Sequence, residues 1–527
     1  MAITNLSALP TELIHLITSS LSFPDVLSLR LATRSLSAKT SSDRRFEQRF
    51  ATRTSDLSTK SLKTLAAIAA HPTFGALVRE VTLVTSFLDT TTLRSTIYTR
   101  KKPPADSPVR VPFSDWDEVG PEELAAARRM LRVYEALQTD RARASAEGQD
   151  LALLVAVFER LGALETLKLE ASVFKSHGEP RGEEQRLHVL RAFNYLPTPS
   201  MLLPSSSSSA AASNNAGGEE RNGRPQLRHG EASGRQQNRR KKTQRRQIWE
   251  MASHDFSITL RAMAQSGIAI NNMLVFGKEW GCSILSAEVG ALLAGRAMFE
   301  AEGIRAAMSR LKYLSISVTQ GSLQMFGGDL ERTTVEQDGI VGNEILEGFA
   351  DLLATCSSLE ELDMRNVWMC NDLGLKRNCT DPRFFGDIAT KAVVPKLRSL
   401  TLRGWTVRAE DVLHLLRKCN DLEELELREV RLWDGQWSQV FRMLGERTRQ
   451  LKQVTLYRCF EKQLIRITRP VGAVIKSDSL GNRFTETFRL SGEEVRDGVD
   501  YCKQAERWSG RWPHTLYRRE RMNEYGF

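Results

Sequence analysis

Apolar residues in the first forty positions of the chain recur at helical spacing. A second helical pattern begins at Phe23-Pro24-Asp25, and a third, shorter one spans Thr33 to Thr40. The apolar face of the first helix, which starts after Pro10, is formed by Leu13, Ile14, Ile17 and Leu21. Three helices of this size enclose too little interior to bury their own apolar surface. Part of that surface is therefore predicted to meet another protein.

Further along, the chain repeats an apolar triplet whose second and third members lie three and five positions after the first. The last two members alternate with polar residues, as a half-buried strand requires. The eight copies are Val78/Val81/Leu83, Leu164/Leu167/Leu169, Ile270/Met273/Val275, Leu311/Leu314/Ile316, Leu359/Leu362/Met364, Leu397/Leu400/Leu402, Leu422/Leu425/Leu427 and Leu451/Val454/Leu456. Five of them follow a predicted helix, at 150–161, 253–265, 344–354, 409–418 and 436–445. This repetition predicts an α/β solenoid with parallel strands inside and helices outside.

These patterns divide the chain into five segments. Residues 1–50 form the helical N-terminal domain, and residues 51–196 and 248–470 form the two parts of the repeat array. Residues 197–247 consist largely of Pro, Ser, Gly, Asn, Arg and Gln and have almost nothing to bury, so we predict a disordered, basic, low-complexity insertion. Residues 471–527 stop repeating, and we interpret them as a C-terminal cap or tail because a solenoid needs a cover over its last repeat.

The positive charge of the chain comes mostly from one cluster. The formal net charge is +10, and residues 235–246 contribute seven cations and no acid, which leaves 10 − 7 = +3 for the rest. The cluster is interpreted as a solvated linker or a nuclear localisation signal. It contains no aromatic residue, which argues against a base-stacking platform. A protein is therefore the favoured partner, and nucleic acid is the less favoured one.

The sequence contains few residues or motifs that indicate catalysis or metal binding. The seven cysteines include no Cys-x-x-Cys pair, which predicts reduced thiols and a cytoplasmic or nuclear location. No metal or cofactor is predicted, because histidines and cysteines do not occur at zinc-ligand spacing. The sequence has no Gly-x-Ser-x-Gly elbow, phosphate-binding loop or His-Glu-x-x-His motif, and no apolar run long enough for a membrane span. We therefore predict a noncatalytic protein without a membrane partner.

The N-terminal helices resemble the F-box, the module through which substrate receptors of SCF ubiquitin ligases hold a Skp-family adaptor. The matching motifs are Leu9-Pro10-x-Glu12-Leu13 and Pro24-Asp25-Val26-Leu27, within residues 6–45. Where many F-boxes end in a cysteine and a tryptophan, this chain has Ala32-Thr33-Arg34-Ser35-Leu36, and an ordinary helical hairpin is the alternative. The residues that the resemblance assigns to adaptor binding are Leu9, Pro10, Leu13, Ile14, Ile17, Leu21, Pro24, Leu27 and Leu31.

The triplets resemble leucine-rich repeats, at irregular intervals and without the asparagine that usually follows the strand. The combination is similar to a large fungal family of F-box receptors with degenerate repeats. It implies a noncatalytic adaptor that binds a Skp-family adaptor and its cullin scaffold through the F-box and an unknown protein substrate through the repeats. Alternatives are an interaction scaffold that assembles no ligase and a nucleic-acid-binding protein acting through the basic cluster. Separate α/β units without a common solenoid are the alternative for the fold.

A substrate surface is predicted from the residue that follows the third apolar position of four consecutive triplets. Neighbouring parallel strands lie about 4.8 Å apart, so these side chains should form one column. Asp363 and Glu426 precede two of the arginines by two residues, and a self-compensated charge ladder is the alternative to binding an acidic or phosphorylated segment. The predicted substrate-binding residues are Arg365, Arg403, Arg428 and Tyr457.

Overall fold

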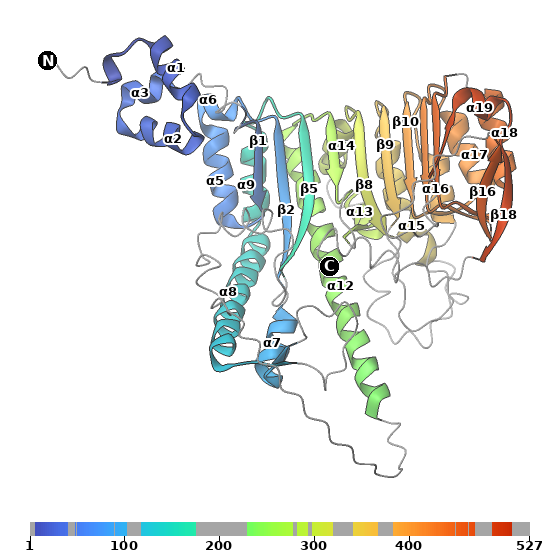
Figure 1. Cartoon of the computed structure of the whole chain (residues 1–527), viewed down its shortest axis with the longest axis horizontal. Coiled ribbons are helices and arrows are strands. Elements are labelled where there is room, and N and C mark those ends of the chain that lie inside the picture. Colours follow the sequence, from blue (N-terminus) through green and yellow to red (C-terminus); the bar gives the residue numbers. More distant parts are fainter. Residues whose placement is uncertain are drawn as a thin grey trace, which may run out of the picture.

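The protein is a mixed α/β molecule built around a long, mostly parallel β-sheet (Figure 1). Its structure, a computed structural model, describes residues 6–40, 48, 50–88, 90–102, 117–174, 229–277, 282–293, 298–319, 341–366, 383–447, 450–461, 463–469 and 487–507.

Within these residues the main sheet has eleven strands. They lie in the order β1 (Thr52–Asp56), β2 (Glu80–Leu88), β5 (Thr166–Phe174), β6 (Asn272–Val275), β8 (Tyr313–Thr319), β9 (Glu361–Asn366), β10 (Ser399–Arg403), β12 (Glu424–Arg428), β14 (Gln453–Tyr457) and β17 (Thr487–Ser491), with β7 (Ile284–Leu285) beside β8. All pairs are parallel except β14 with β17. Strand order therefore follows chain order, as expected of successive repeating units.

The eight apolar triplets lie in register across this sheet. Their second members form one continuous row, Val81, Leu167, Met273, Leu314, Leu362, Leu400, Leu425 and Val454. Every member of every triplet is buried. The register confirms the prediction that the triplets form neighbouring parallel strands, and it explains why their spacing is kept: a slip of one residue would turn each apolar pair to the opposite face.

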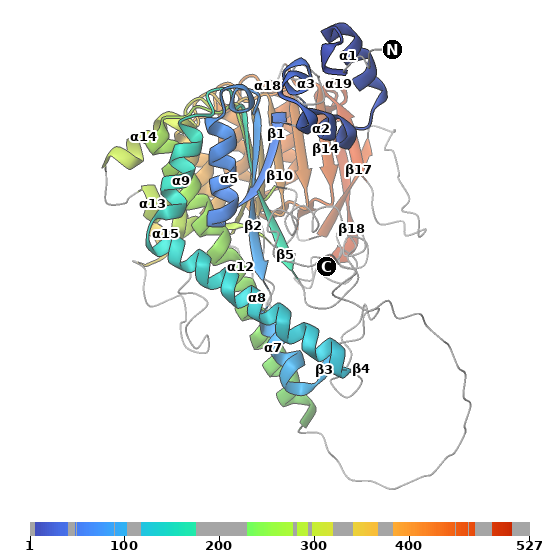
Figure 2. The same ribbon diagram turned by 90° about the vertical axis from the view of Figure 1, so that its left-hand side faces the viewer.

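Helices cover one face of the main sheet (Figure 2). Successive helices pack against one another along the sheet, so each apolar triplet is enclosed between strand and helix. They are α5 (Thr59–Ala70), α6 (Pro72–Gly75), α9 (Gln149–Phe158), α12 (His229–Ser266), α13 (Ser286–Leu293), α14 (Met298–Met308), α15 (Val341–Ala354), α16 (Arg383–Lys391), α17 (Ala409–Lys418) and α18 (Trp437–Arg447). The five predicted helices correspond to α9, α12, α15, α17 and α18.

Helix α12 includes the last part of the predicted insertion. Residues 197–228 lie outside the described part of the chain, but residues 229–247 belong to the 38-residue helix α12. The backbone of residues 229–247 is helical, and the disorder expected of the insertion as a whole stays a prediction. Arg, Lys and Gln are good helix formers, and the buried C-terminal half of the helix removes the cost of nucleation.

A second, five-stranded sheet accompanies the last repeats. Its strands are β11 (Thr406–Arg408), β13 (Arg431–Asp434), β15 (Phe460–Glu461), β16 (Gln463–Arg469) and β18 (Asp500–Arg507). At the end of the main sheet, α19 (Gly492–Arg496) follows β17 and packs on α18. The capping role expected for residues 471–527 stays a prediction, and residues 471–486 and 508–527 lie outside the described part.

The N-terminal residues form a three-helix module at one end of the molecule (Figure 1). A 3₁₀ turn (Leu6–Ala8) precedes α1 (Thr11–Ser20), α2 (Phe23–Ala32) and α3 (Arg34–Lys39), as the sequence predicts. Side-chain caps begin the second and third helices: Ser22 accepts from the Asp25 backbone N–H, and Thr33 from that of Leu36.

A helical arm extends beyond the sheet on the side opposite this module (Figures 1 and 2). It consists of α7 (Thr90–Thr99), the short pair β3 (Lys101–Lys102) and β4 (Asp117–Glu118), α8 (Pro121–Ala146) and the N-terminal half of α12. The arm has its own small core, formed by Val84, Leu88, Leu93, Ala127 and Tyr134.

Candidate functional site

The three-helix module exposes large apolar side chains although it has a core of its own. Ile14, Val26 and Leu36 are buried between the helices. The exposed leucines of α1 and α2 are Leu13 (46% exposed), Leu16 (68%), Leu27 (42%) and Leu31 (89%). Scattered exposed leucines are ordinary, but four within nineteen residues of so small a module mark a surface suited to contact with another protein.

The predicted adaptor-binding residues divide by burial. Pro10, Leu13, Pro24, Leu27 and Leu31 are exposed, whereas Leu9, Ile17 and Leu21 are half-buried. Ile14 is fully buried, so its assignment to the contact surface is wrong. The first helix is apolar on two adjacent faces, and the spacing of its leucines and isoleucines does not tell which face the other two helices cover. For the same reason the sequence analysis missed the exposed Leu16.

Polar contacts hold the start of the module in place. The Lys39 ammonium donates to the carbonyls of Ser7 and Leu9 at 2.8 and 2.5 Å. The ring of His15 contacts the Lys39 carbonyl through Nε2 at 2.9 Å. These contacts attach the turn that carries Leu9 and Pro10 to α3, so the Leu9-Pro10 segment and α1 present a fixed surface.

The predicted substrate column lies in register, as the sequence indicates. Arg365, Arg403, Arg428 and Tyr457 occupy equivalent positions at the ends of β9, β10, β12 and β14. Arg365 is buried and donates to the Gly277 carbonyl at 3.5 Å, so its assignment to an accessible surface is wrong. Position within the repeat alone does not determine this burial. The other three are partly exposed.

Two carboxylates balance the positive charge of the arginines in the column. Arg403 Nε lies 3.2 Å from Asp363 Oδ1, and Arg428 contacts Glu426 on its own strand. Asp363 also accepts from the Ser315 hydroxyl at 3.1 Å. Burial raises the pKa of the Asp363 carboxyl, although the nearby Arg403 guanidinium opposes this change. The ion pairs of the alternative interpretation are therefore present, and a partner would have to compete with them.

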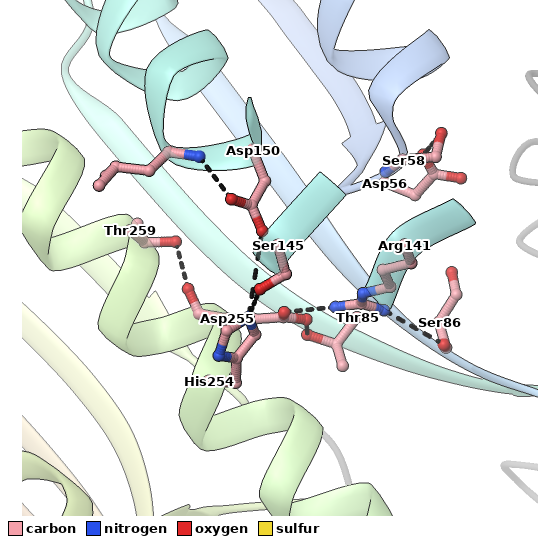
Figure 3. Close-up of polar contacts among 11 residues, drawn as sticks. Asp56, Ser58, Thr85, Ser86, Arg141, Ser145, Asp150, His254, Asp255 and Thr259 are labelled. Carbon is pink, nitrogen blue, oxygen red and sulfur yellow. Dashed lines mark hydrogen bonds and ion pairs between the residues drawn. The ribbon is translucent and has the colours of Figure 1, made fainter. Parts of the chain in front are cut away.

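A buried polar network joins the base of the arm to the sheet (Figure 3). Asp255 of α12 is almost completely buried; it accepts from the Thr85 hydroxyl of β2 at 2.6 Å and pairs with the Arg141 guanidinium of α8. Arg141 also donates to the Ser86 carbonyl at 3.5 Å. The acid raises the pKa of Arg141 against the opposing effect of burial. The sequence analysis missed this pair, whose members lie 114 residues apart.

Beside this network, Ser145, His254 and Asp150 form a set that resembles a hydrolase triad by composition (Figure 3). The Ser145 hydroxyl lies 2.9 Å from His254 Nε2, and Asp150 Oδ2 lies 4.0 Å from the same nitrogen. A triad needs the acid at the opposite ring nitrogen, where it fixes the tautomer that accepts the serine proton. This geometry therefore does not activate Ser145.

Neither a comparison with protein-family models nor one with curated proteins returns a match to this chain. Among the described helices, none is both long and apolar enough to cross a bilayer. The class that the structure defines is a mixed α/β protein with a mostly parallel central sheet. Two surfaces on this framework bear on function: the exposed leucines of the N-terminal module and the partly exposed column of the sheet.

Proposed function

We propose that the protein is a noncatalytic adaptor of an SCF-type ubiquitin ligase. In this proposal the N-terminal module is an F-box that binds a Skp-family adaptor, and the parallel-strand array is an irregular leucine-rich-repeat domain that binds a protein substrate. Substrate lysines would then be held near a ubiquitin-charged enzyme supplied by the complex, which raises the effective concentration of the two reactants.

The observation that carries the proposal is the exposure of Leu13, Leu16, Leu27 and Leu31 on a module that already has a buried core. Apolar side chains that a fold does not need for its own interior are the ones available to a partner. They fall within the stretch that resembles an F-box, and the eight triplets in register agree with a repeat domain behind it.

The proposed substrate surface is the partly exposed part of the column, Arg403, Arg428 and Tyr457. Guanidinium groups pair with carboxylates and phosphates through two parallel hydrogen bonds, so this surface suits an acidic or phosphorylated segment. Asp363 and Glu426 already pair with two of the arginines, so a partner binds only if it competes with these internal acids.

Copurification with a Skp-family adaptor tests the proposal. Leu13→Asp with Leu31→Asp places two charges on the exposed face without touching the core, so adaptor binding should fall at least tenfold. Val393→Asp with Tyr98→Asp is the matched control, since both residues are exposed and lie outside the module. Equal adaptor recovery from the two double variants, with unchanged melting temperatures, would refute the F-box assignment.

The rival function is an interaction scaffold that assembles no ligase. It shares the exposed leucines but requires no cullin. Cullin recovered with the wild-type chain and lost with Leu13→Asp/Leu31→Asp supports the ligase adaptor. Recovery of the Skp-family adaptor without cullin favours the scaffold instead.

A further inference from the structure

Two exposed charges of opposite sign lie on the face of the main sheet opposite its buried core. They are Glu424, at the start of β12, and Arg489, in β17. The buried Leu425 follows Glu424, and the buried Phe488 and Leu490 flank Arg489. Because successive side chains of a strand point to opposite faces, both charges point away from the core.

Neither charge is balanced within the described part of the chain. No hydrogen bond or ion pair joins the side chain of Glu424 or Arg489 to another residue there. The arginines of the column differ, because internal acids already pair with two of them. A partner must compete for those two arginines, whereas it can bind Glu424 and Arg489 without displacing an internal contact.

The strand between these two charges is neutral. It is β14, which pairs with β12 on one side and with β17 on the other, and it presents Gln453, Thr455 and Tyr457 on the same face. Gln453 Nε2 donates to Thr455 Oγ1 at 3.0 Å, so these two side chains contact each other. A segment that crossed β14 would therefore meet a charge only at its two ends.

The register of the strands gives the separation of the two charges. Glu424 is level with Gln453 and Ser491, so it lies two strands and two residues away from Arg489. Two strand spacings are about 9.6 Å and two residues along a strand about 6.8 Å, which gives a diagonal of about 12 Å. An extended segment advances about 3.3 Å per residue, so about four residues cover this distance. Residues four apart in such a segment face the same side, whereas residues three apart do not.

The charge available at Arg489 favours a carboxylate over a phosphate. One guanidinium pairs with one carboxylate through two parallel hydrogen bonds. A phosphorylated side chain carries about 1.5 to 2 negative charges at pH 7, so it needs a second cation. Arg428, on the same face, already contacts Glu426. At the other end, Glu424 requires a lysine or an arginine of the partner.

We propose that Arg489 and Glu424 select a partner segment that crosses β14 in extended form and carries an aspartate or glutamate four residues away from a lysine or arginine. This inference rests on the substrate-binding role proposed above for the array, and it narrows the substrate to a segment of mixed charge. The alternative is that the exposed arginine of β17, at the end of the main sheet, only prevents that edge from pairing with other strands.

Selection from a library of random nonapeptides displayed on yeast tests the proposal with a defined probe. The full chain is the target, and acid–base pairs are counted at each spacing in the selected peptides. Pairs four apart should be enriched at least fivefold over the unselected library, and pairs two or three apart less than twofold. R489Q/E424Q should abolish this enrichment. The matched control is R466Q/E361Q, which removes the same two charges from other exposed positions and should keep it.

A second measurement identifies the anionic group. The most enriched peptide is synthesised once as selected and once with phosphoserine in place of its acid, and fluorescence anisotropy gives both affinities for the full chain. The phosphoserine peptide should bind at least fivefold more weakly. Equal or tighter binding of that peptide would overturn the assignment to a carboxylate.

Three outcomes of the selection would overturn the proposal. The first is that the wild-type chain enriches no spacing. The second is that R489Q/E424Q enriches the same pairs as wild type, which would leave the two charges with a structural role alone. The third is that R403Q/R428Q abolishes the enrichment while R489Q/E424Q keeps it, which would place the site in the column. Copurification of the Skp-family adaptor with R489Q/E424Q should equal that of wild type, so failure of this inference is distinguishable from failure of the adaptor function.

Discussion

Arg398 and Glu423 stand next to each other just before strands β10 and β12, and Arg398 Nε donates to Glu423 Oε1 at 2.9 Å. Lys452, at the same position before β14, donates to the other carboxylate oxygen at 2.5 Å. Backbone N–H groups link the whole series of equivalent positions, Arg79, Glu165, Asn271, Lys312, Glu360, Arg398, Glu423 and Lys452. We call this series the charge ladder.

The charge ladder alternates in sign along most of its length. Arg79 pairs with Glu165 at 3.4 Å, and Lys312 pairs with Glu360 at 3.3 Å. Opposite charges on neighbouring strands favour the native order of repeats, and like charges there disfavour it. The charge ladder lies outside the apolar core. We therefore expect it to influence which strands pair with one another more than how tightly the core packs.

Glu423 is predicted to be the most sensitive position of the charge ladder, because it serves two cations. Glu423→Gln should lower the melting temperature at pH 7 more than Arg398→Gln or Lys452→Gln. The control is Glu424→Gln, which removes the same charge from the exposed adjacent residue. Thermal unfolding of the four variants measures the order, and an effect of Glu424→Gln as large as that of Glu423→Gln would contradict it.

The same residue predicts a pH dependence. Hydrogen bonds from Lys452, and then from Arg398, lower the pKa of the Glu423 carboxyl. A lowered pKa in the folded state means that this stability is present above the ordinary glutamate range and is lost as the pH falls through the lowered pKa. The difference in melting temperature between wild type and Glu423→Gln should therefore disappear on acidification. A difference that grows toward low pH would show the opposite sign.

The buried Arg141–Asp255 pair should matter more to stability than any exposed ion pair. Asp255→Ala leaves a guanidinium at the base of the arm without its acid and should reduce the free energy of unfolding by about 3–5 kcal/mol. Asp140→Ala breaks the exposed pair with Arg143 on the same helix and should cost less than about 1 kcal/mol. Urea unfolding compares the two, and similar costs would mean that the buried pair is solvated.

The repeats could be predicted from the sequence because their signal is local. Each triplet carries its strand and its turn within six residues, and eight copies repeat one pattern, so pattern and register agree. The second sheet carried no such signal, since β15 has two residues and β11 three. Strands this short are defined by pairing partners that the repeats bring together.

The burial of single side chains could not be predicted in the same way. Arg365 and Arg403 occupy the same position of neighbouring strands, yet one is buried and the other partly exposed. Leu13 and Ile14 are adjacent on one helix and divide between surface and core. In each case tertiary neighbours decide the outcome, and these lie far away in the sequence. The start of α12 at His229 was not predicted either, because low-complexity composition hides helix propensity.

Cysteine reactivity should separate into two classes. Burial raises the pKa of the Cys356, Cys419 and Cys459 thiols to about 12, so almost no thiolate forms at pH 8. Cys502 is exposed and should react with iodoacetamide in the folded protein. Mass spectrometry resolves the sites, and unfolding in urea is the control that should make all four react. Early labelling of Cys356 or Cys419 in the folded state would contradict their burial.

The column at the ends of the strands gives the sharpest test of the substrate surface, because two substitutions should act in opposite directions. Arg403→Gln with Arg428→Gln removes the proposed receptors and should reduce capture of an acidic or phosphorylated partner at least fivefold. The cost in stability should stay near 0.2–1 kcal/mol per pair, as for other partly exposed ion pairs. Capture is measured by affinity purification from a lysate in which degradation is blocked.

Glu426→Gln should have the reverse effect on capture. It removes the internal acid that pairs with Arg428. If a partner competes with Glu426 for the arginine, capture should rise in this variant while the melting temperature falls slightly. If the column only balances its own charges and binds no partner, both variants should change stability alone and leave capture at the wild-type level. That result would keep the column as a structural feature and move the substrate site to another part of the array.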